Sequence, residues 1–189
     1  KVQTLASDTA ASLAATGSWA SGGNRPAGVQ AGTGFGSGST SGLAATGNLY
    51  PPNSITVDVQ TYDGSSWTEV ANVNTGRKYL AASGGSPQTA GIIFGGGLSP
   101  GPGTLYAVSE TWNGSAWTEV ADLNTARDNI RGAGAASTAA LAFGGNSGPG
   151  AEEETETWNG TAWTEVGDLN TTRGNGAGFG TNTNAIAAG

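Results

Sequence analysis

Aromatic and β-branched residues alternate with polar residues on both sides of a short glycine-containing turn, and this pattern occurs three times in the chain. Alternation with a period of two is typical of β-strands, because successive side chains point to opposite faces of a sheet. The copies run from Gln60 to Arg77, from Glu110 to Arg127 and from Glu156 to Arg173. Each copy therefore predicts a β-hairpin that is followed by the segment Asn-Thr-x-Arg.

The turn of each hairpin contains an Asp-Gly or Asn-Gly pair. These pairs are favoured in two-residue type I′ turns, in which both central residues have a positive φ. Such a turn would place Trp112 and Trp117 diagonally on one face, where they would pack against a neighbouring sheet. We therefore expect a structural glycine and a buried, structurally equivalent tryptophan in every copy. These residues are Gly64, Gly114, Gly160, Trp67, Trp117 and Trp163.

An arginine closes each copy, at Arg77, Arg127 and Arg173. A desolvated guanidinium needs fixed carbonyl or carboxylate partners, so we expect these arginines to be structural and buried. Asp122 and Asp168 precede the last two by five residues and are the expected partners. The alternative, that the arginines bind an anionic ligand, is less favoured.

A strand pair rich in glycine and alanine follows each arginine and ends at Gly95-Gly96 in one unit and at Gly144-Gly145 in the next. Successive tryptophans at the same repeat position lie roughly 50 residues apart, a spacing typical of four-stranded propeller blades. The order of arginine, strand, apolar strand ending in Gly-Gly, aromatic strand, turn and tryptophan resembles the kelch repeat. The resemblance covers about residues 18–189 and is strongest over residues 48–145.

The kelch resemblance implies a β-propeller in which Gly-Gly ends the second strand of a blade and the aromatic residue and tryptophan lie on the third and fourth. It implies no particular activity, since kelch repeats serve enzymes and scaffolds alike. The segment Asn-Gly-x-x-Trp-Thr-Glu-Val also resembles, in style, the repeat proteins of marine tailed phages.

The predicted fold is therefore all-β: one kelch-like propeller over residues 1–189, with five small blades. Glycines at the same repeat position mark five inner strand pairs: Gly17, Gly47, Gly96, Gly145 and Gly189. The expected units are about 1–24, 25–76, 77–126, 127–172 and 173–189. Because open sheet edges are normally covered, we expect residues 1–17 beside residues 176–189. The alternative is a partial ring that another chain completes.

Composition narrows the chemistry. Seven basic and fourteen acidic residues give a net charge of −7, which offers nucleic acid no basic surface. No apolar run approaches the roughly 18 residues of a membrane span, so we expect no membrane insertion. Cysteine and histidine are absent, which excludes thiolate or imidazole metal ligands and Ser-His or Cys-His catalysis. We expect no metal and no cofactor. The chain begins at Lys1 and not at methionine, so a processed or longer precursor is expected.

The remaining enzymatic reading is a glycosidase with a carboxylate pair. Its candidates, Glu69, Glu119 and Glu165, recur at one repeat position and so face equivalent surroundings. Catalysis by two carboxylates requires unlike environments. We therefore do not expect an enzyme.

The predicted function is a structural or interaction propeller on a virion surface or tail, with other protein subunits as partners and a virion or extracellular location. The alternative is a carbohydrate-binding propeller with aromatic platforms; exposed tryptophans would favour it, and buried ones the first reading. An intracellular kelch adaptor is less favoured because such adaptors usually carry additional domains. Binding would occur at loops 97–104 and 146–154. The candidate contact residues are Leu98, Ser99, Asn146, Ser147, Glu152 and Glu153.

Overall fold

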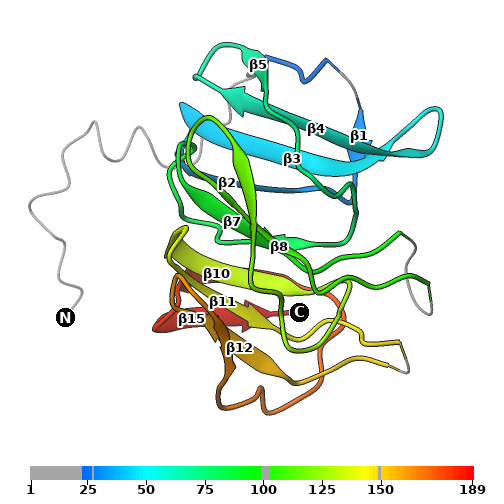
Figure 1. Cartoon of the computed structure of the whole chain (residues 1–189), viewed down its shortest axis with the longest axis vertical. Coiled ribbons are helices and arrows are strands. Elements are labelled where there is room, and N and C mark those ends of the chain that lie inside the picture. The colour runs from blue at the N-terminus through cyan, green and yellow to red at the C-terminus, as the bar shows by residue number, and fades with distance from the viewer. Residues whose placement is uncertain (1–22, 27, 99–102, 149) are drawn as a thin grey trace, which may run out of the picture.

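The computed structural model describes residues 23–26, 28–98, 103–148 and 150–189. These residues form fifteen strands in four antiparallel sheets and contain no helix, as Figure 1 shows. The prediction of an all-β fold is therefore confirmed. The first expected unit, residues 1–24, lies almost entirely outside the described residues, as does the expected placement of residues 1–17.

The strands follow one another in chain order. Sheet 1 contains β1 (Val29–Gln30), β2 (Thr33–Gly38), β3 (Ser41–Leu49), β4 (Ser54–Tyr62) and β5 (Trp67–Val70). Sheet 2 contains β6 (Ala81–Ala82), β7 (Gly91–Phe94), β8 (Ser109–Trp112) and β9 (Trp117–Val120). Sheet 3 contains β10 (Arg131–Ala136), β11 (Ala139–Phe143), β12 (Thr155–Trp158) and β13 (Trp163–Glu165). Sheet 4 contains β14 (Ala177–Thr181) and β15 (Asn184–Ala188).

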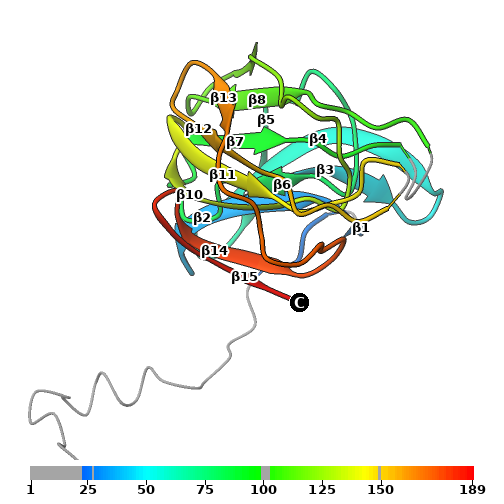
Figure 2. The ribbon, with the colours of Figure 1, turned by 90° about the horizontal axis from the view of Figure 1, so that it is seen from below.

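Sheets 1, 2 and 3 follow one another along the long axis of the molecule, and sheet 4 lies beside sheet 3 (Figure 1). Contacts between neighbouring sheets join β2 to β6, β6 to β10 and β10 to β14. Figure 2 shows β6 near the middle of the view, β8 and β13 toward its upper border, and β14 and β15 toward its lower border. We call the interface of sheets 1 and 2 seam A, that of sheets 2 and 3 seam B, and that of sheets 3 and 4 seam C.

The apolar core is divided between seams. One buried cluster joins Phe35, Leu43 and Val59 of sheet 1 to Ile93 and Trp117 of sheet 2. A second cluster fills seam B in the same way. Glycine permits the close approach in seam A, where a Cβ on Gly91 would lie 2.4 Å from the ring of Phe35. Each sheet is therefore stabilised mainly by burying one face against the next.

The hairpin turns differ from the two-residue type I′ prediction. Trp112 pairs directly with Trp117, so four residues connect β8 to β9, and the two rings face each other without the expected diagonal offset. The Asn113 Oδ1 accepts hydrogen bonds from the backbone N–H groups of Ser115 and Ala116, both at 2.9 Å. The asparagine side chain thus replaces a tight backbone turn. Positive φ is found at the following glycine of every copy: 100° at Gly64, 94° at Gly114 and 94° at Gly160.

Candidate functional site

The recurring arginine of seam A is fully buried. The Arg77 Nη1 donates to Glu110 Oε1 at 2.6 Å, and its Nε donates to the Gly95 carbonyl at 2.9 Å. Glu110, on β8, is fully buried as well, and its Oε2 accepts from the backbone N–H and the side-chain Nδ2 of Asn74 at 2.7 and 2.9 Å. We call this arrangement the Arg–Glu latch: an Asn-Thr-x-Arg segment of one sheet bound to a glutamate on the third strand of the next.

Seam B repeats the latch. The Arg127 Nη2 donates to Glu156 Oε1 at 2.7 Å, and its Nη1 donates to the Gly144 carbonyl at 2.9 Å. Glu156 Oε2 accepts from the backbone N–H and Nδ2 of Asn124, both at 2.8 Å. A buried ion pair stabilises a fold only when its remaining hydrogen-bonding groups are satisfied. Both carboxylates meet that condition, whereas the Arg127 Nε has no hydrogen-bond partner among the described residues and lies 3.7 Å from Glu154 Oε2.

Within the latch of seam A, the carboxylate of Glu110 lies against the buried charge of Arg77. Burial lowers the pKa of Arg77, and the hydrogen bond that its guanidinium donates to Glu110 opposes that shift. The guanidinium of Arg77 nevertheless stays a cation, because arginine is not deprotonated in proteins. The arginine is thus bound on all sides by protein groups and presents no face to an anionic ligand.

The expected aspartate partners were wrong. Asp122 is exposed, and the Asp168 Oδ1 accepts from the backbone N–H of Thr155 at 3.1 Å. Each aspartate lies in the same linker as its arginine, whereas the guanidinium extends across to the next sheet. The repeat contains a pattern that could have predicted the true partners: each copy opens with Gln60, Glu110 or Glu156, and an arginine precedes each of these residues. In the first copy the Arg25 Nε donates to Gln60 Oε1 at 2.8 Å.

The tryptophans form a second set of seam contacts. The ring of Trp117 lies 6.4 Å from Phe35 across seam A, and that of Trp163 lies 4.8 Å from Phe94 across seam B. Trp117 and Trp163 are buried, but Trp67 is only partly buried, so the expected equivalence fails at the first copy. Trp67 lies on sheet 1, and the described residues contain no sheet that precedes sheet 1 and could cover its ring. The Trp67 Nε1 donates to the Gly23 carbonyl at 2.9 Å.

Arg173 differs from the other two arginines. It is partly exposed, and its Nη1 donates to the carbonyl of Gly189 at the end of β15. Over the described ranges it forms no ion pair. Within the described part of the chain, seam C therefore has the arginine of a latch but not the glutamate.

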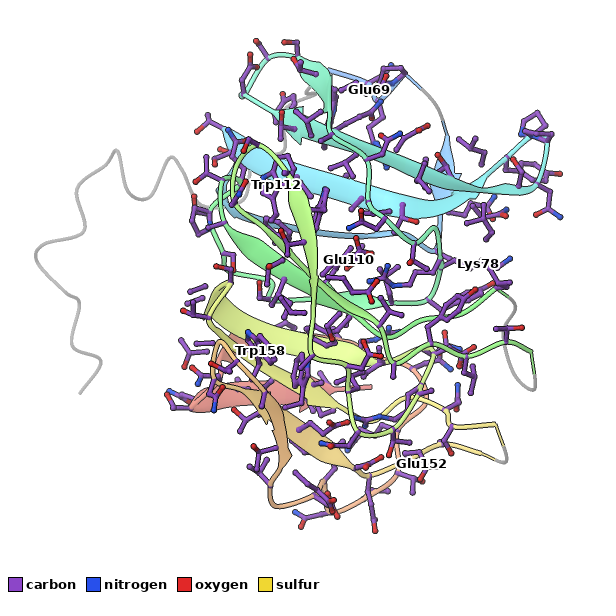
Figure 3. All side chains as sticks on the ribbon, in the orientation of Figure 1. Glu69, Lys78, Glu110, Trp112, Glu152 and Trp158 are labelled. Atoms are coloured by element: carbon purple, nitrogen blue, oxygen red, sulfur yellow. The ribbon has the colours of Figure 1, made fainter. Side chains whose placement is uncertain are left out.

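The candidate binding loops gather at one end of the molecule. The connections after β3, β7 and β11 all lie on the right in Figure 1, and Figure 3 shows Lys78 and Glu152 on that side and Trp112 and Trp158 on the other. We call the described part of these connections, with Lys78, the loop end; it comprises residues 50–53, 97–98, 103–104, 146–148 and 150–154.

Loop residues differ in how firmly they are held. Leu98 is 39% exposed, and Glu153 is exposed. The Asn146 Nδ2 donates to Asp128 Oδ1 at 3.2 Å, and the Ser147 hydroxyl donates to Glu152 Oε1. Ser99 lies outside the described residues. The structure thus brings the predicted loop residues to one end, where the 146–152 loop is braced internally.

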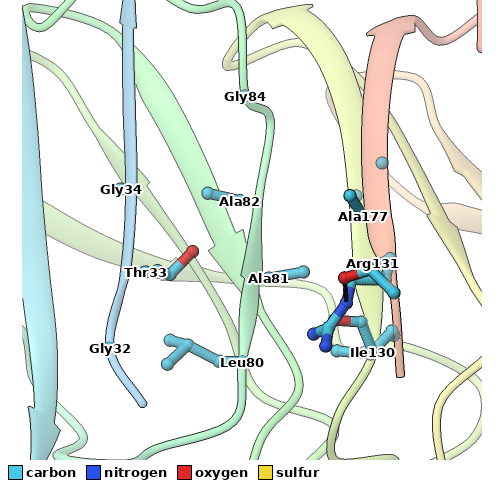
Figure 4. Close-up of a pocket in the computed structure, with 13 residues that line it drawn as sticks. Gly32, Thr33, Gly34, Leu80, Ala81, Ala82, Gly84, Ile130, Arg131 and Ala177 are labelled. Atoms are coloured by element: carbon cyan, nitrogen blue, oxygen red, sulfur yellow. Dashed lines mark hydrogen bonds between the residues drawn. The ribbon is translucent and has the colours of Figure 1, made fainter. Parts of the chain in front are cut away.

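A cavity of ≈ 300 Å³ lies among the first strands of the sheets, as Figure 4 shows. Its walls are mostly glycine and alanine, and its ionisable side chain is Arg131, whose Nε donates to the carbonyl of Gly176. Burial lowers the pKa of Arg131, but the group remains a cation. The cavity therefore offers no pair of acid and base groups.

The other carboxylates do not assemble a site. Glu69, Glu119 and Glu165 are each exposed, at equivalent positions on the last strands of their sheets. Across the part of the chain with described coordinates, no group of three or more acidic residues could hold a metal ion. Nor do those ranges contain a helix long and apolar enough to cross a membrane.

Comparisons with known proteins bear on the fold alone. No family model matches the chain, and no curated protein matches it in sequence. The solved structure of YjhT, a β-propeller-like protein, superimposes with a TM-score of 0.67 at 11% identity over 87% of this chain. The chain has a propeller-like fold. The match spans 63% of the YjhT chain, so this chain covers less than two thirds of that protein's length.

Proposed function

We propose that the protein is a non-catalytic, kelch-like β-propeller that acts by binding other proteins. The observation that carries this proposal is the Arg–Glu latch, because it uses the repeated ionisable residues of seams A and B for internal packing. The kelch reading is supported by Gly95-Gly96 after the second strand of sheet 2 and by Trp112 and Trp117 on its third and fourth strands. The proposed ring has five blades, of which sheets 1 to 4 supply four.

The proposed location is a virion surface or tail, where the loop end would contact other virion proteins or a host surface. Three loops from consecutive sheets meet there, and surface loops on a rigid scaffold commonly carry binding function. The phage-like style of the repeat sequence supports the same setting.

Cross-linking through lysine tests this proposal. The chain has two lysines, Lys1 and Lys78, and Lys78 belongs to the loop end, so a link from Lys78 reports on a partner bound there. Assembled phage particles that contain the chain would be treated with an amine-reactive cross-linker and analysed by mass spectrometry. We expect links from Lys78 to another virion protein, and their loss in Lys78→Arg, which keeps the charge. Absence of the chain from purified particles would reject the proposal.

Carbohydrate binding is the second candidate, and one observation favours it. Tyr50 is 64% exposed at the loop end, where its ring could stack on a sugar. The burial of Trp112, Trp117, Trp158 and Trp163 counts against it, because these rings are unavailable as platforms. A glycan array separates the two functions: sugar binding that is lost in Tyr50→Ala would favour the lectin.

A further inference from the structure

Among the described residues, the outer edge of β15 pairs with no strand. In sheets 1 to 3 the second strand of the repeat pairs with a third strand, β4, β8 or β12, whereas β15 pairs with β14 alone. Figure 2 shows β15 at the border of the molecule. Such an edge presents unpaired backbone N–H and C=O groups and can accept another strand.

The polar groups beside this edge already have the geometry that binds a third strand elsewhere. Arg173 donates to the Gly189 carbonyl as Arg127 donates to the Gly144 carbonyl. In seam B the same guanidinium also binds the carboxylate of Glu156, on the third strand. Seam C thus holds half of a latch, and the missing half is a carboxylate.

The apolar residues of the same linker are also uncovered. Leu169 is partly exposed, whereas Leu123, at the same place in the preceding copy, is 4% exposed. Val166 is 40% exposed, whereas Val120 packs against the core cluster of seam B. In seam B, Leu123 and Val120 belong to a cluster that includes Trp158 and Trp163, from the outer hairpin of the next sheet.

The strand registers fix how a third strand would align. Leu141 pairs with Ala133, and Ile186 pairs with Phe179 in the corresponding hairpin, so Ala187 corresponds to Ala142. Ala142 is the residue directly opposite the latch glutamate of β12. An added strand in the same register would place its glutamate opposite Ala187, beside Arg173.

We infer that the edge of β15 binds an antiparallel β-hairpin of the repeat's own outer type, with a latch glutamate and a tryptophan pair. Residues 1–22 contain no glutamate and no Trp-Asn-Gly-x-x-Trp segment, so they cannot supply this sequence. The described hairpins of this type, β8–β9 and β12–β13, are engaged in their own sheets, which argues against a second copy. We assign the occupant to a partner protein that carries such a hairpin. This surface is separate from the loop end, and its failure would leave the proposed function untouched.

A synthetic peptide with the sequence of residues 153–166, labelled with a fluorophore, provides the probe. We expect it to bind the whole chain, with affinity reduced about tenfold or more by Glu156→Gln in the peptide, because a charge-assisted hydrogen bond is lost. Arg173→Gln in the protein should cause a similar loss, and combining both changes should cost little more. Arg25→Gln removes the same charge beside Gln60 and serves as the control, with peptide affinity unchanged.

Hydrogen exchange gives a readout that requires no variant. Peptide binding should slow amide exchange within Asn184–Ala188, as expected when the edge gains a strand. Absence of saturable peptide binding, or equal affinity for the glutamate and glutamine peptides, would overturn the inference. The inference would also be overturned if the amides of the edge were protected from exchange without peptide. Loss of that protection on dilution would indicate a second copy as the occupant, and loss on deletion of residues 1–22 would indicate that segment.

Discussion

Seams B and C begin with the same linker sequence pattern but are completed differently. In seam B, Arg127 is fully buried and Glu156 reaches it from the third strand of the next sheet. In seam C, Arg173 is partly exposed, and its side chain donates only to the carbonyl of Gly189 among the described residues. The burial of the arginine therefore depends on the outer hairpin of the following sheet. A sequence repeat supplies one half of each seam, and the neighbouring repeat must supply the other.

The largest contrast between complete and incomplete seams should appear on removing one charge. Glu110→Ala leaves Arg77 buried without its carboxylate, and we expect the free energy of unfolding to fall by about 3–5 kcal/mol. Arg173→Ala should cost less than about 1 kcal/mol, because its cation is partly exposed and has no ionic partner among the described residues. Urea unfolding monitored by tryptophan fluorescence measures both. Equal losses would show that the latch is no more important than a surface charge.

The tryptophans extend the comparison to packing. Trp117→Ala should destabilise the protein by about 3–5 kcal/mol, because a buried aromatic ring is removed from seam A. Trp67→Ala should cost clearly less, since Trp67 is only partly buried. Thermal and urea unfolding of the two variants give the test. A change below about 1 kcal/mol for Trp117→Ala would mean that its ring is not part of the core.

Seams A and B also differ at one hydrogen bond. The Trp163 Nε1 donates to Ser109 Oγ at 3.0 Å, whereas the Trp117 Nε1 is buried with no partner among the described residues. Val59 holds the position in sheet 1 that Ser109 holds in sheet 2, as their pairing with Ala45 and Phe94 shows. The unpaired indole is therefore explained by one residue.

Substituting these two side chains should have unequal effects on stability. Ser109→Val should lower the free energy of unfolding by about 1–3 kcal/mol, because it leaves a buried donor unsatisfied. Val59→Thr should cost less than about 1 kcal/mol, since its hydroxyl can accept from Trp117 Nε1. The difference between the two variants is the measurement. A larger loss for Val59→Thr would show that its hydroxyl does not reach the indole.

The smallest effect concerns the exposed turn of sheet 1. Hydrogen bonds from the backbone N–H groups of Ser66 and Ser65 lower the pKa of Asp63 to about 2 from 3.8. Because the folded-state pKa of Asp63 is lower than its unfolded-state pKa, the ionised carboxylate stabilises the turn at pH values above the unfolded-state pKa. This contribution is lost as the pH falls from about 4 to about 2. Proton NMR of the Ser65 and Ser66 amides should titrate with a midpoint near 2, and Asp63→Asn should abolish the step. A midpoint near 3.8 would contradict the hydrogen-bonded turn.

The repeat predicted much of the fold because β-strand alternation and glycine turns are local signals. The recurrence of an arginine at one repeat position also predicted structural arginines, and Arg77 and Arg127 have that role. It did not predict the glutamate partners, because the pairing joins different sheets and depends on how those sheets are placed. The length of the turn was missed as well, since Asn-Gly suits both a two-residue turn and the observed four-residue loop held by Asn113.

A double-mutant cycle on Arg127 and Glu156 tests most directly whether the latch joins neighbouring sheets. Arg127→Met, Glu156→Met and the double variant would be compared by urea unfolding, with Arg173→Met and Glu165→Met as a control cycle. We predict that the double variant is less destabilised than the sum of the single variants by about 0.5–3 kcal/mol, and that the control cycle is additive. Additivity within about 0.3–0.5 kcal/mol at Arg127 and Glu156 would contradict the latch.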